Sequence, residues 1–382
     1  MDRMLVKIAL FAEDSARRCL IRELFDMVAR FAQGHKGCSG YIMAPSGVGK
    51  TELVDAFVYE IPNFFPNVEC LLLDAACQEL PQISTYVSTG KKLLVVIDNM
   101  EILYSHEQHK HVVLQIAGII NARTDPKIVV IGIGSSLKLR RLLLMDTSVK
   151  EEFTNVGKVP KLNGGKFPMF ANHLHNAVSE EQFQMLVEHI APDYYHSLLP
   201  QDLATRLAKL MWITGGNPRA LSQILAPKED DSTYSLNPVQ RVCNVVSNLL
   251  ERSAQLDQGE QRALKQMMKK IIRRNYSIDL RQVVKFGGCG LCLDPGPLVF
   301  WYGPNPLSPY LRPVPMGQHP DLDALCYKGL LVYGPGGYYA AAPLLVPAFL
   351  LRRPSIPTVL DALKDKFMFL APSAGHAVGL LL

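Results

Sequence analysis

A short glycine-rich segment near residue 50 constrains the fold of this chain more than any other feature. It matches a phosphate-binding loop at every position but the first, where the pattern has Gly and this chain has Ala. Its eight residues are Ala44, Pro45, Ser46, Gly47, Val48, Gly49, Lys50 and Thr51. Gly47 and Gly49 let successive backbone N–H groups turn toward a phosphate. We expect Lys50 to neutralise phosphate oxygens and the Thr51 hydroxyl to ligate magnesium.

The sequence on both sides of the loop argues against the alternative, a chance match. Residues 41–43 are an apolar run that ends at the loop, and residues 52–58 have the apolar spacing of an amphipathic helix that leaves it. Residues 93–97 are five consecutive branched apolar residues followed by Asp98, as in a strand buried on both faces. We predict that Asp98 is the Walker B carboxylate, which holds magnesium beside the loop. The alternative is a strand that happens to end in Asp.

The apolar runs predict a parallel sheet covered by helices. A helical stripe at residues 15–33 precedes the first run, and helical or loop sequence separates the runs that follow. Such alternation implies right-handed β-α-β crossovers. The four expected strands are residues 41–43, 68–73, 93–97 and 128–133, with a weaker fifth at residues 156–162.

The chain has 382 residues, which is long for one hydrophobic core, so we expect two or three domains. The pattern becomes helical from Ser179 onward, and we place the first boundary between residues 164 and 179. The expected parts are a P-loop core at 1–165, a helical lid at 166–252, a winged-helix-like domain at 253–352 and a tail at 353–382. The fold class is α/β, with a P-loop NTPase parallel sheet, a helical lid and a C-terminal winged-helix-like domain.

Composition limits the classes of function. The formal net charge of +5 neither requires nor excludes nucleic acid, and 20% charged with 48% hydrophobic residues is ordinary for a globular protein. The eight cysteines lack the spacing of a disulfide framework, which favours an intracellular location, cytoplasmic or nuclear. The longest apolar tract, residues 338–351, contains Pro343 and Pro347 and is too short to cross a bilayer, so we expect no membrane contact.

Four segments in this order resemble AAA+ and STAND-type ATPases, and most of all the archaeal-type ATPases and origin-recognition-like initiators. They are residues 44–51, 95–101, 128–135 and 215–221. The resemblance covers residues 10–225 by motif and residues up to about 350 by general pattern. It implies ATP and Mg²⁺ as ligands. It also implies that Ser135 is a polar sensor near the γ-phosphate, and that Arg219 contacts the phosphates from the lid.

Two departures from the family pattern bear on hydrolysis. Asn99 follows Asp98 where active relatives have a Glu that polarises the attacking water, and Asn cannot accept a proton. Glu101 is a possible substitute on the same loop, although an acidic residue is also common at a helix N-terminus for its dipole. Ala44 replaces a Gly, which matters if this position needs a positive φ. We therefore expect nucleotide binding with slow or conditional hydrolysis.

The C-terminal region predicts helices followed by a hairpin, as in a winged helix. Residues 263–274 form a basic helix, and residues 321–328 a later helix before a hairpin at residues 330–340. The interval 286–320 contains six Gly and eight Pro, which predicts an irregular insertion. Because the later helix is acidic and the hairpin turn has no basic residue, we favour a protein partner over DNA.

Our interpretation of the sequence is an ATP-dependent switch, in which Mg²⁺-ATP joins core and lid through Lys50, Thr51, Asp98 and Arg219. The alternatives are a DNA-associated initiator or mobile-element ATPase, and a non-hydrolysing interaction module with a vestigial loop. An oligomer is possible, because Arg140 and Arg141 could complete a neighbouring subunit's site; solvated helix charges are the competing explanation.

Overall fold

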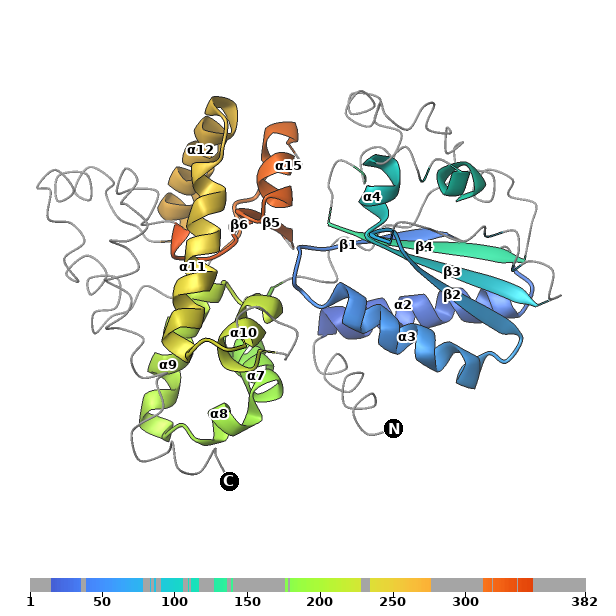
Figure 1. Cartoon of the computed structure of the whole chain (residues 1–382), viewed down its shortest axis with the longest axis horizontal. Coiled ribbons are helices and arrows are strands. Elements are labelled where there is room, and N and C mark those ends of the chain that lie inside the picture. Colours follow the sequence, from blue (N-terminus) through green and yellow to red (C-terminus); the bar gives the residue numbers. More distant parts are fainter. Residues whose placement is uncertain are drawn as a thin grey trace, which may run out of the picture. The chain divides into compact units, whose positions relative to one another are not determined.

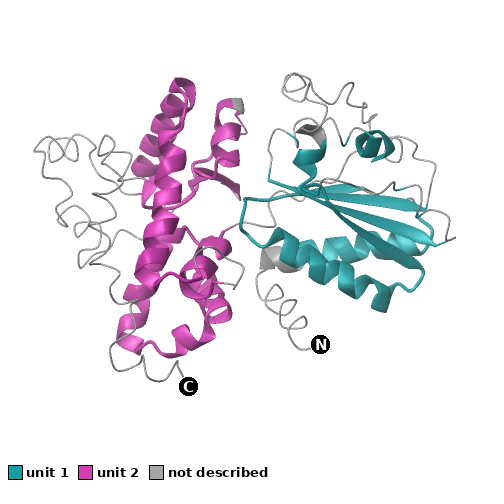
Figure 2. Ribbon diagram, in the orientation of Figure 1, with its two compact units in different colours: residues 1–175 teal, residues 176–382 magenta. Residues whose placement is uncertain are grey.

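The chain divides into two compact units, residues 1–175 and residues 176–382 (Figure 2). The computed structural model describes residues 15–35, 39–77, 83, 86, 91–105, 109, 111–116, 127–135, 139, 176–177, 179–227, 234–275, 312–317, 319–334 and 336–345. Within these ranges, no helix is both long and apolar enough to cross a membrane.

The first unit contains a four-stranded parallel sheet (Figure 1). Its strands are β1 (Gly40–Met43), β2 (Val68–Asp74), β3 (Lys92–Asp98) and β4 (Ile128–Gly134), in the spatial order β1-β4-β3-β2. Residues 93–98 and all of β4 are buried, because branched apolar side chains there pack on both faces of the sheet. The predicted α/β fold with a parallel sheet is confirmed. The fifth strand expected at residues 156–162 lies outside the described residues.

Two helices, α2 (Ser15–Ala32) and α3 (Lys50–Phe64), cover one face of this sheet (Figure 1). Side chains spaced three or four residues apart on each helix, such as Leu20, Leu24 and Phe57, join the strands in one hydrophobic cluster. On the opposite face lies α4 (Met100–Ser105), which packs against β4. Because α3 begins at Lys50, it directly continues the glycine-rich loop, and its packing on the sheet fixes the position of the loop.

The second unit begins with a group of helices around a separate hydrophobic cluster. They are α7 (Glu180–Ile190), α8 (Pro192–His196), α9 (Pro200–Thr214), α10 (Pro218–Leu225) and α11 (Pro238–Ala254). Four of the five start with Pro, whose missing N–H costs nothing at that position. The Asn217 side chain caps α10 by accepting a hydrogen bond from the Ala220 N–H, at 3.1 Å.

The remaining described elements form a third cluster within the second unit. They are α12 (Gln258–Asn275), α15 (Pro320–Tyr327) and the antiparallel strands β5 (Leu331–Gly334) and β6 (Gly337–Ala340). Helices followed by a hairpin therefore occur in the order that the sequence predicts. Most of the Gly- and Pro-rich interval 286–320 lies outside the described residues.

Candidate functional site

The glycine-rich loop connects β1 to α3 and has the backbone that its sequence predicts. Gly47 and Gly49 have φ angles of 81° and 85°, which L-residues with a Cβ rarely adopt. Ala44 is outside this left-handed region, so a Cβ is tolerated at the position where the pattern has Gly. The first N–H groups of an α-helix have no acceptor within the helix, so the start of α3 at Lys50 favours an anion there.

The Lys50 ammonium group is held at the centre of the loop. Its Nζ donates to the carbonyl oxygens of Ala44, at 3.0 Å, and Pro45, at 2.8 Å. A third hydrogen bond, also 2.8 Å, joins it to the Ser135 Oγ at the end of β4. Since Lys50 is only 9% exposed, its charge is concentrated within the concave loop.

Thr51 and Asp98 meet although 47 residues separate them. The Thr51 hydroxyl donates to Asp98 Oδ2 at 2.5 Å, and the Asp98 side chain is 7% exposed. A hydroxyl and a carboxylate at the end of a buried strand are oxygen ligands of the kind that magnesium prefers. Together with the Lys50 charge, this donor set fits a magnesium nucleotide.

Glu101 lies beside Ser135 and is partly buried. Its Oε1 accepts a hydrogen bond from the Ser135 N–H at 3.1 Å. Burial raises the pKa of the Glu101 carboxyl above its ordinary value, and the negative charge of Asp98 acts in the same direction. Backbone N–H donors, including that of Ser135, and the positive charge of Lys50 partly offset this increase in the pKa.

The carboxyl group of Glu101 occupies space that a glycine leaves open. A Cβ on Gly134 would collide with Glu101 Oε2 and with the Tyr41 hydroxyl oxygen. A side chain at position 134 would therefore displace the Glu101 carboxyl and the Tyr41 hydroxyl, and Tyr41 and Gly134 are members that the sequence analysis missed. Their only signal is their position, because each lies in a strand that ends at the loop or at Ser135.

The Asn99 side chain is bonded to the end of a neighbouring strand. The φ of this residue is 53°, and its side-chain amide donates to Asp74 Oδ1 at 2.9 Å. Asp74 ends β2 beside Asp98 and was also missed. A sequence signal did exist, because an apolar strand followed by Asp occurs at both positions.

The structure brings together, in the first unit, the whole loop and the predicted residues Asp98, Glu101 and Ser135. Arg219 belongs to the second unit, where it lies in the first turn of α10 with an exposed side chain. Arg140 and Arg141 lie outside the described residues. The contact predicted between Arg219 and the phosphates therefore remains a prediction.

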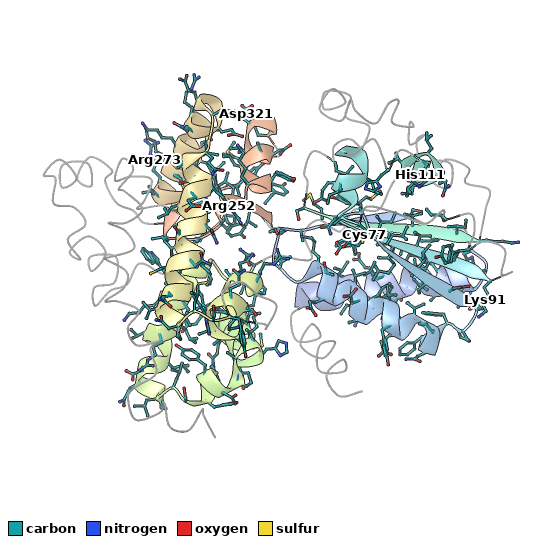
Figure 3. All side chains as sticks on the ribbon, in the orientation of Figure 1. Cys77, Lys91, His111, Arg252, Arg273 and Asp321 are labelled. Carbon is teal, nitrogen blue, oxygen red and sulfur yellow. The ribbon has the colours of Figure 1, made fainter. Side chains whose placement is uncertain are left out.

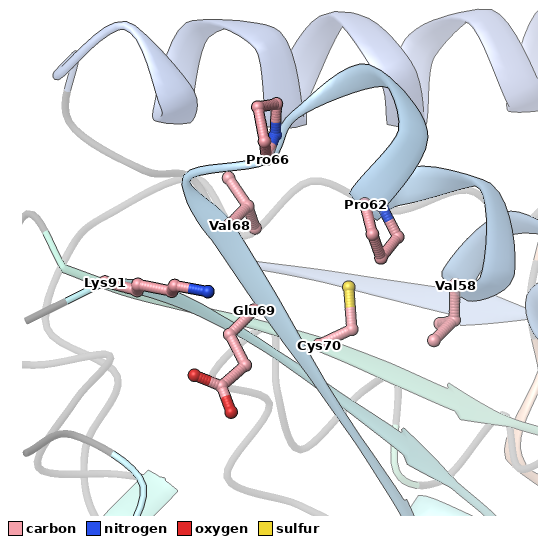
Figure 4. A pocket seen from close by; sticks show the side chains of 7 residues that line it. All are labelled: Val58, Pro62, Pro66, Val68, Glu69, Cys70 and Lys91. Carbon is pink, nitrogen blue, oxygen red and sulfur yellow. The ribbon is translucent and has the colours of Figure 1, made fainter. Parts of the chain in front are cut away.

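A groove of about 640 Å³ lies at the other edge of the sheet (Figure 4). It is lined by Val58, Pro62, Pro66, Val68, Glu69, Cys70 and Lys91. Lys91 precedes the start of β3, whereas Cys77 follows the end of β2, so the two side chains mark opposite edges in Figure 3. Burial raises the pKa of the Cys70 thiol to about 12, which keeps this group protonated and unreactive at neutral pH. The groove lies at the amino ends of β2 and β3, whereas the glycine-rich loop follows the carboxyl end of β1.

Comparison with solved structures finds similarity at low sequence identity. A Walker-type ATPase of Pyrococcus abyssi matches 86% of this chain and 94% of its own, with 13% identity and a TM-score of 0.44. Cdc6p of Pyrobaculum aerophilum matches 92% and 95%, with 12% identity and a TM-score of 0.38. Drosophila ORC, in a structure bound to DNA, matches 88% and 86%, with 13% identity and a TM-score of 0.37.

The chain is thus similar to these three structures at 12–13% identity and at TM-scores below 0.5. No family model matches the sequence, and no curated protein does.

The pKa of Glu101 predicts how the stability of the first unit changes with pH. A folded-state pKa above the ordinary value of 4.5 means that the folded chain binds this proton more tightly than the unfolded chain. The contribution of Glu101 to stability is therefore present below about pH 4.5 and is lost as the pH rises through the folded-state pKa. Glu101→Gln has no such proton, so its stability relative to the parent should increase over this range.

Urea unfolding at a series of pH values, followed by a spectroscopic probe placed in the first unit, measures this difference. Gln33→Ala, which changes an exposed amide after α2 and no ionisable group, is the control and should show a difference that is constant with pH. A constant difference for Glu101→Gln as well would contradict the raised pKa.

Proposed function

We propose that this chain is an ATP-binding P-loop NTPase that acts as a nucleotide-dependent switch with slow or conditional hydrolysis. The observation that carries the proposal is the meeting of Lys50, Thr51, Asp98 and Ser135 at the carboxyl ends of β1, β3 and β4. Ligands of parallel α/β sheets bind at this edge. A vestigial loop has no need to keep a buried lysine, a threonine and an aspartate in mutual contact.

Each residue has a separate task in the proposed site. Backbone N–H groups of the loop and of the first turn of α3 bind phosphate oxygens, and Lys50 neutralises their charge. Thr51 and Asp98 hold magnesium, which neutralises the charge that develops on the phosphates during transfer. Ser135 connects the end of β4 to Lys50, so a ligand that contacts Lys50 also acts on the end of β4.

We assign the role of general base in hydrolysis to Glu101. Asn99 cannot act as a base, and its side chain is bonded to Asp74. Burial of Glu101 raises its pKa toward the range in which a carboxylate is an effective proton acceptor. The Glu101 carboxylate accepts a hydrogen bond from the Ser135 N–H. The hydroxyl of the same serine contacts Lys50, so Glu101 is held close to that hydroxyl. Slow turnover follows, because a carboxylate held in this way has little freedom to reach a water molecule.

The switch depends on the lid. Arg219 lies in the first turn of α10, after the glycine pair at residues 215–216, and an arginine there suits phosphate contact from the helical part. A ligand that binds both parts in one arrangement shifts the equilibrium toward that arrangement. We further propose that residues 253–352 are a winged-helix-like domain that binds a protein partner, since Tyr327 on α15 is 64% exposed and Asp321 on the same helix is exposed too.

Equilibrium binding of ATP in the presence of magnesium tests the proposal. Lys50→Ala should lose binding by at least about tenfold, because an unscreened phosphate charge remains in the loop. The matched control is Lys91→Ala, which removes an exposed lysine from the same unit at the groove on the opposite edge of the sheet and should bind as the parent does. Absence of binding by the parent would leave an interaction module on a vestigial loop.

Single-turnover hydrolysis tests the assignment of Glu101. Glu101→Gln should bind ATP like the parent and hydrolyse it about 10²-fold more slowly, which is the usual effect of removing a general base. Asn99→Glu should not accelerate turnover, because residue 99 has a left-handed backbone and faces Asp74. Faster turnover in Asn99→Glu, together with an unchanged rate in Glu101→Gln, would transfer the role to position 99.

One observation favours a second function, binding to DNA. The exposed residues Arg262, Lys265, Lys269 and Arg273 have the spacing of a single face of α12, and residues 261–275 include no acidic residue. Arg273 on this helix is labelled in Figure 3. Such a face suits a row of phosphates. The acidic α15 argues against DNA at the same domain, which is why we place this function second.

Titration of duplex DNA at several salt concentrations tests the second function. If α12 binds phosphates, changing Lys265, Lys269 and Arg273 to Gln should weaken binding. The slope of log K against log salt should fall by about 0.9 for each phosphate that is no longer neutralised. Changing Arg22, Lys91 and Lys127, three exposed basic residues of the first unit, controls for net charge. Equal slopes for both triple variants would exclude α12 as the DNA-binding face.

A further inference from the structure

The residue after Asp98 has an unusual backbone conformation. Asn99 is the only residue other than glycine with a positive φ in the described part of the chain. Non-glycine residues in this conformation are uncommon, and Asn is among the few that tolerate it. The Asn99 carbonyl accepts a hydrogen bond from the Ile102 N–H at 2.8 Å, so the left-handed residue also starts α4.

Asn99 links two carboxylates from neighbouring strands. Its backbone N–H donates to Asp98 Oδ1 at 2.8 Å, and its side-chain amide donates to Asp74 Oδ1 at 2.9 Å. Asp74 and Asp98 are register partners at the ends of β2 and β3. The same Asp74 oxygen accepts from the Ala76 N–H at 2.9 Å, which fixes the carboxylate over the turn that follows β2.

The two oxygens of Asp98 are both held by donors. Oδ1 accepts from Asn99, and Oδ2 accepts from the Thr51 hydroxyl. The plane of the carboxylate is therefore defined by two hydrogen bonds that come from different segments of the chain. Hydrogen bonds that a metal ligand receives from residues outside the metal's own coordination orient that ligand and tune the affinity for the metal.

The geometry points to Asn99 as a positioning residue, which orients the Asp98 carboxylate for magnesium and is itself fixed by Asp74. This inference rests on the proposed nucleotide function. It gives position 99 a task that a Glu could not perform. A Glu side chain has no N–H to donate to Asp74, and its charge would add to those of two neighbouring carboxylates.

Two substitutions separate the side chain of Asn99 from its backbone. Asn99→Gly retains the left-handed conformation and the N–H group that bonds to Asp98, and removes only the amide bond to Asp74. Asp74→Ala removes the acceptor of that bond. Asp74→Asn is the conservative control, because its amide oxygen still accepts from Asn99 and from the Ala76 N–H.

The experiment measures ATP affinity of the full chain in excess magnesium and in EDTA, and compares the increase in affinity that magnesium gives. Asn99→Gly and Asp74→Ala should reduce this increase by about tenfold, the lower end of the usual effect of removing a group that orients a metal ligand. Both should bind ATP in EDTA as the parent does. Asp74→Asn should recover most of the increase, which a general disturbance of the fold would not reproduce.

The possible results distinguish this inference from the proposed function. If the parent binds no ATP in either condition, the proposed function fails and the inference fails with it. If magnesium raises the affinity of the parent and of both variants equally, the inference is wrong and the proposed function stands. Equal decreases in affinity in magnesium and in EDTA would also overturn the inference, because they indicate a distorted loop instead of a misplaced carboxylate.

Discussion

The parallel pairing of β3 with both of its neighbours is the constraint on which the site depends. Asp98 ends β3 beside Asp74 of β2, and β4 on the other side brings Ser135 to the same edge. Pairing of β1 with β4 continues into the loop, where the Ala44 N–H donates to the Gly134 carbonyl at 3.1 Å. Residues that are far apart in the sequence meet because parallel strands have all their carboxyl ends at one edge.

Charged side chains are partly buried at this edge of the sheet. The Lys50 ammonium group bonds to two backbone carbonyl oxygens and to the Ser135 hydroxyl, and the backbone N–H of the same serine bonds to Glu101. Burial of Glu101 raises its pKa, so the folded chain accepts a carboxylate that is costly to ionise. A cost of this kind is common at functional sites and uncommon in parts of a fold that only provide stability.

The sequence was sufficient to predict the loop and four strands, because Leu93 to Ile97 and Ile128 to Ile133 are continuous branched runs, and Lys50 and Thr51 occupy fixed places in a motif. It did not predict the left-handed backbone of Asn99 or its bond to Asp74, since both depend on the turn after β2. Gly134 was missed for a similar reason, because the space it leaves is visible only when Tyr41 and Glu101 are in place.

Hydrogen–deuterium exchange with and without Mg²⁺-ATP tests most directly whether the loop binds phosphate. We expect slower exchange of the backbone amides of residues 47–51 and of Asn99 when the nucleotide is present, because these amides lie in the loop or are bonded to Asp98. The peptide at residues 66–70, which lines the groove at the opposite edge, should be unchanged. ATP binding that slows exchange at the groove and leaves residues 47–51 unaffected would contradict the account.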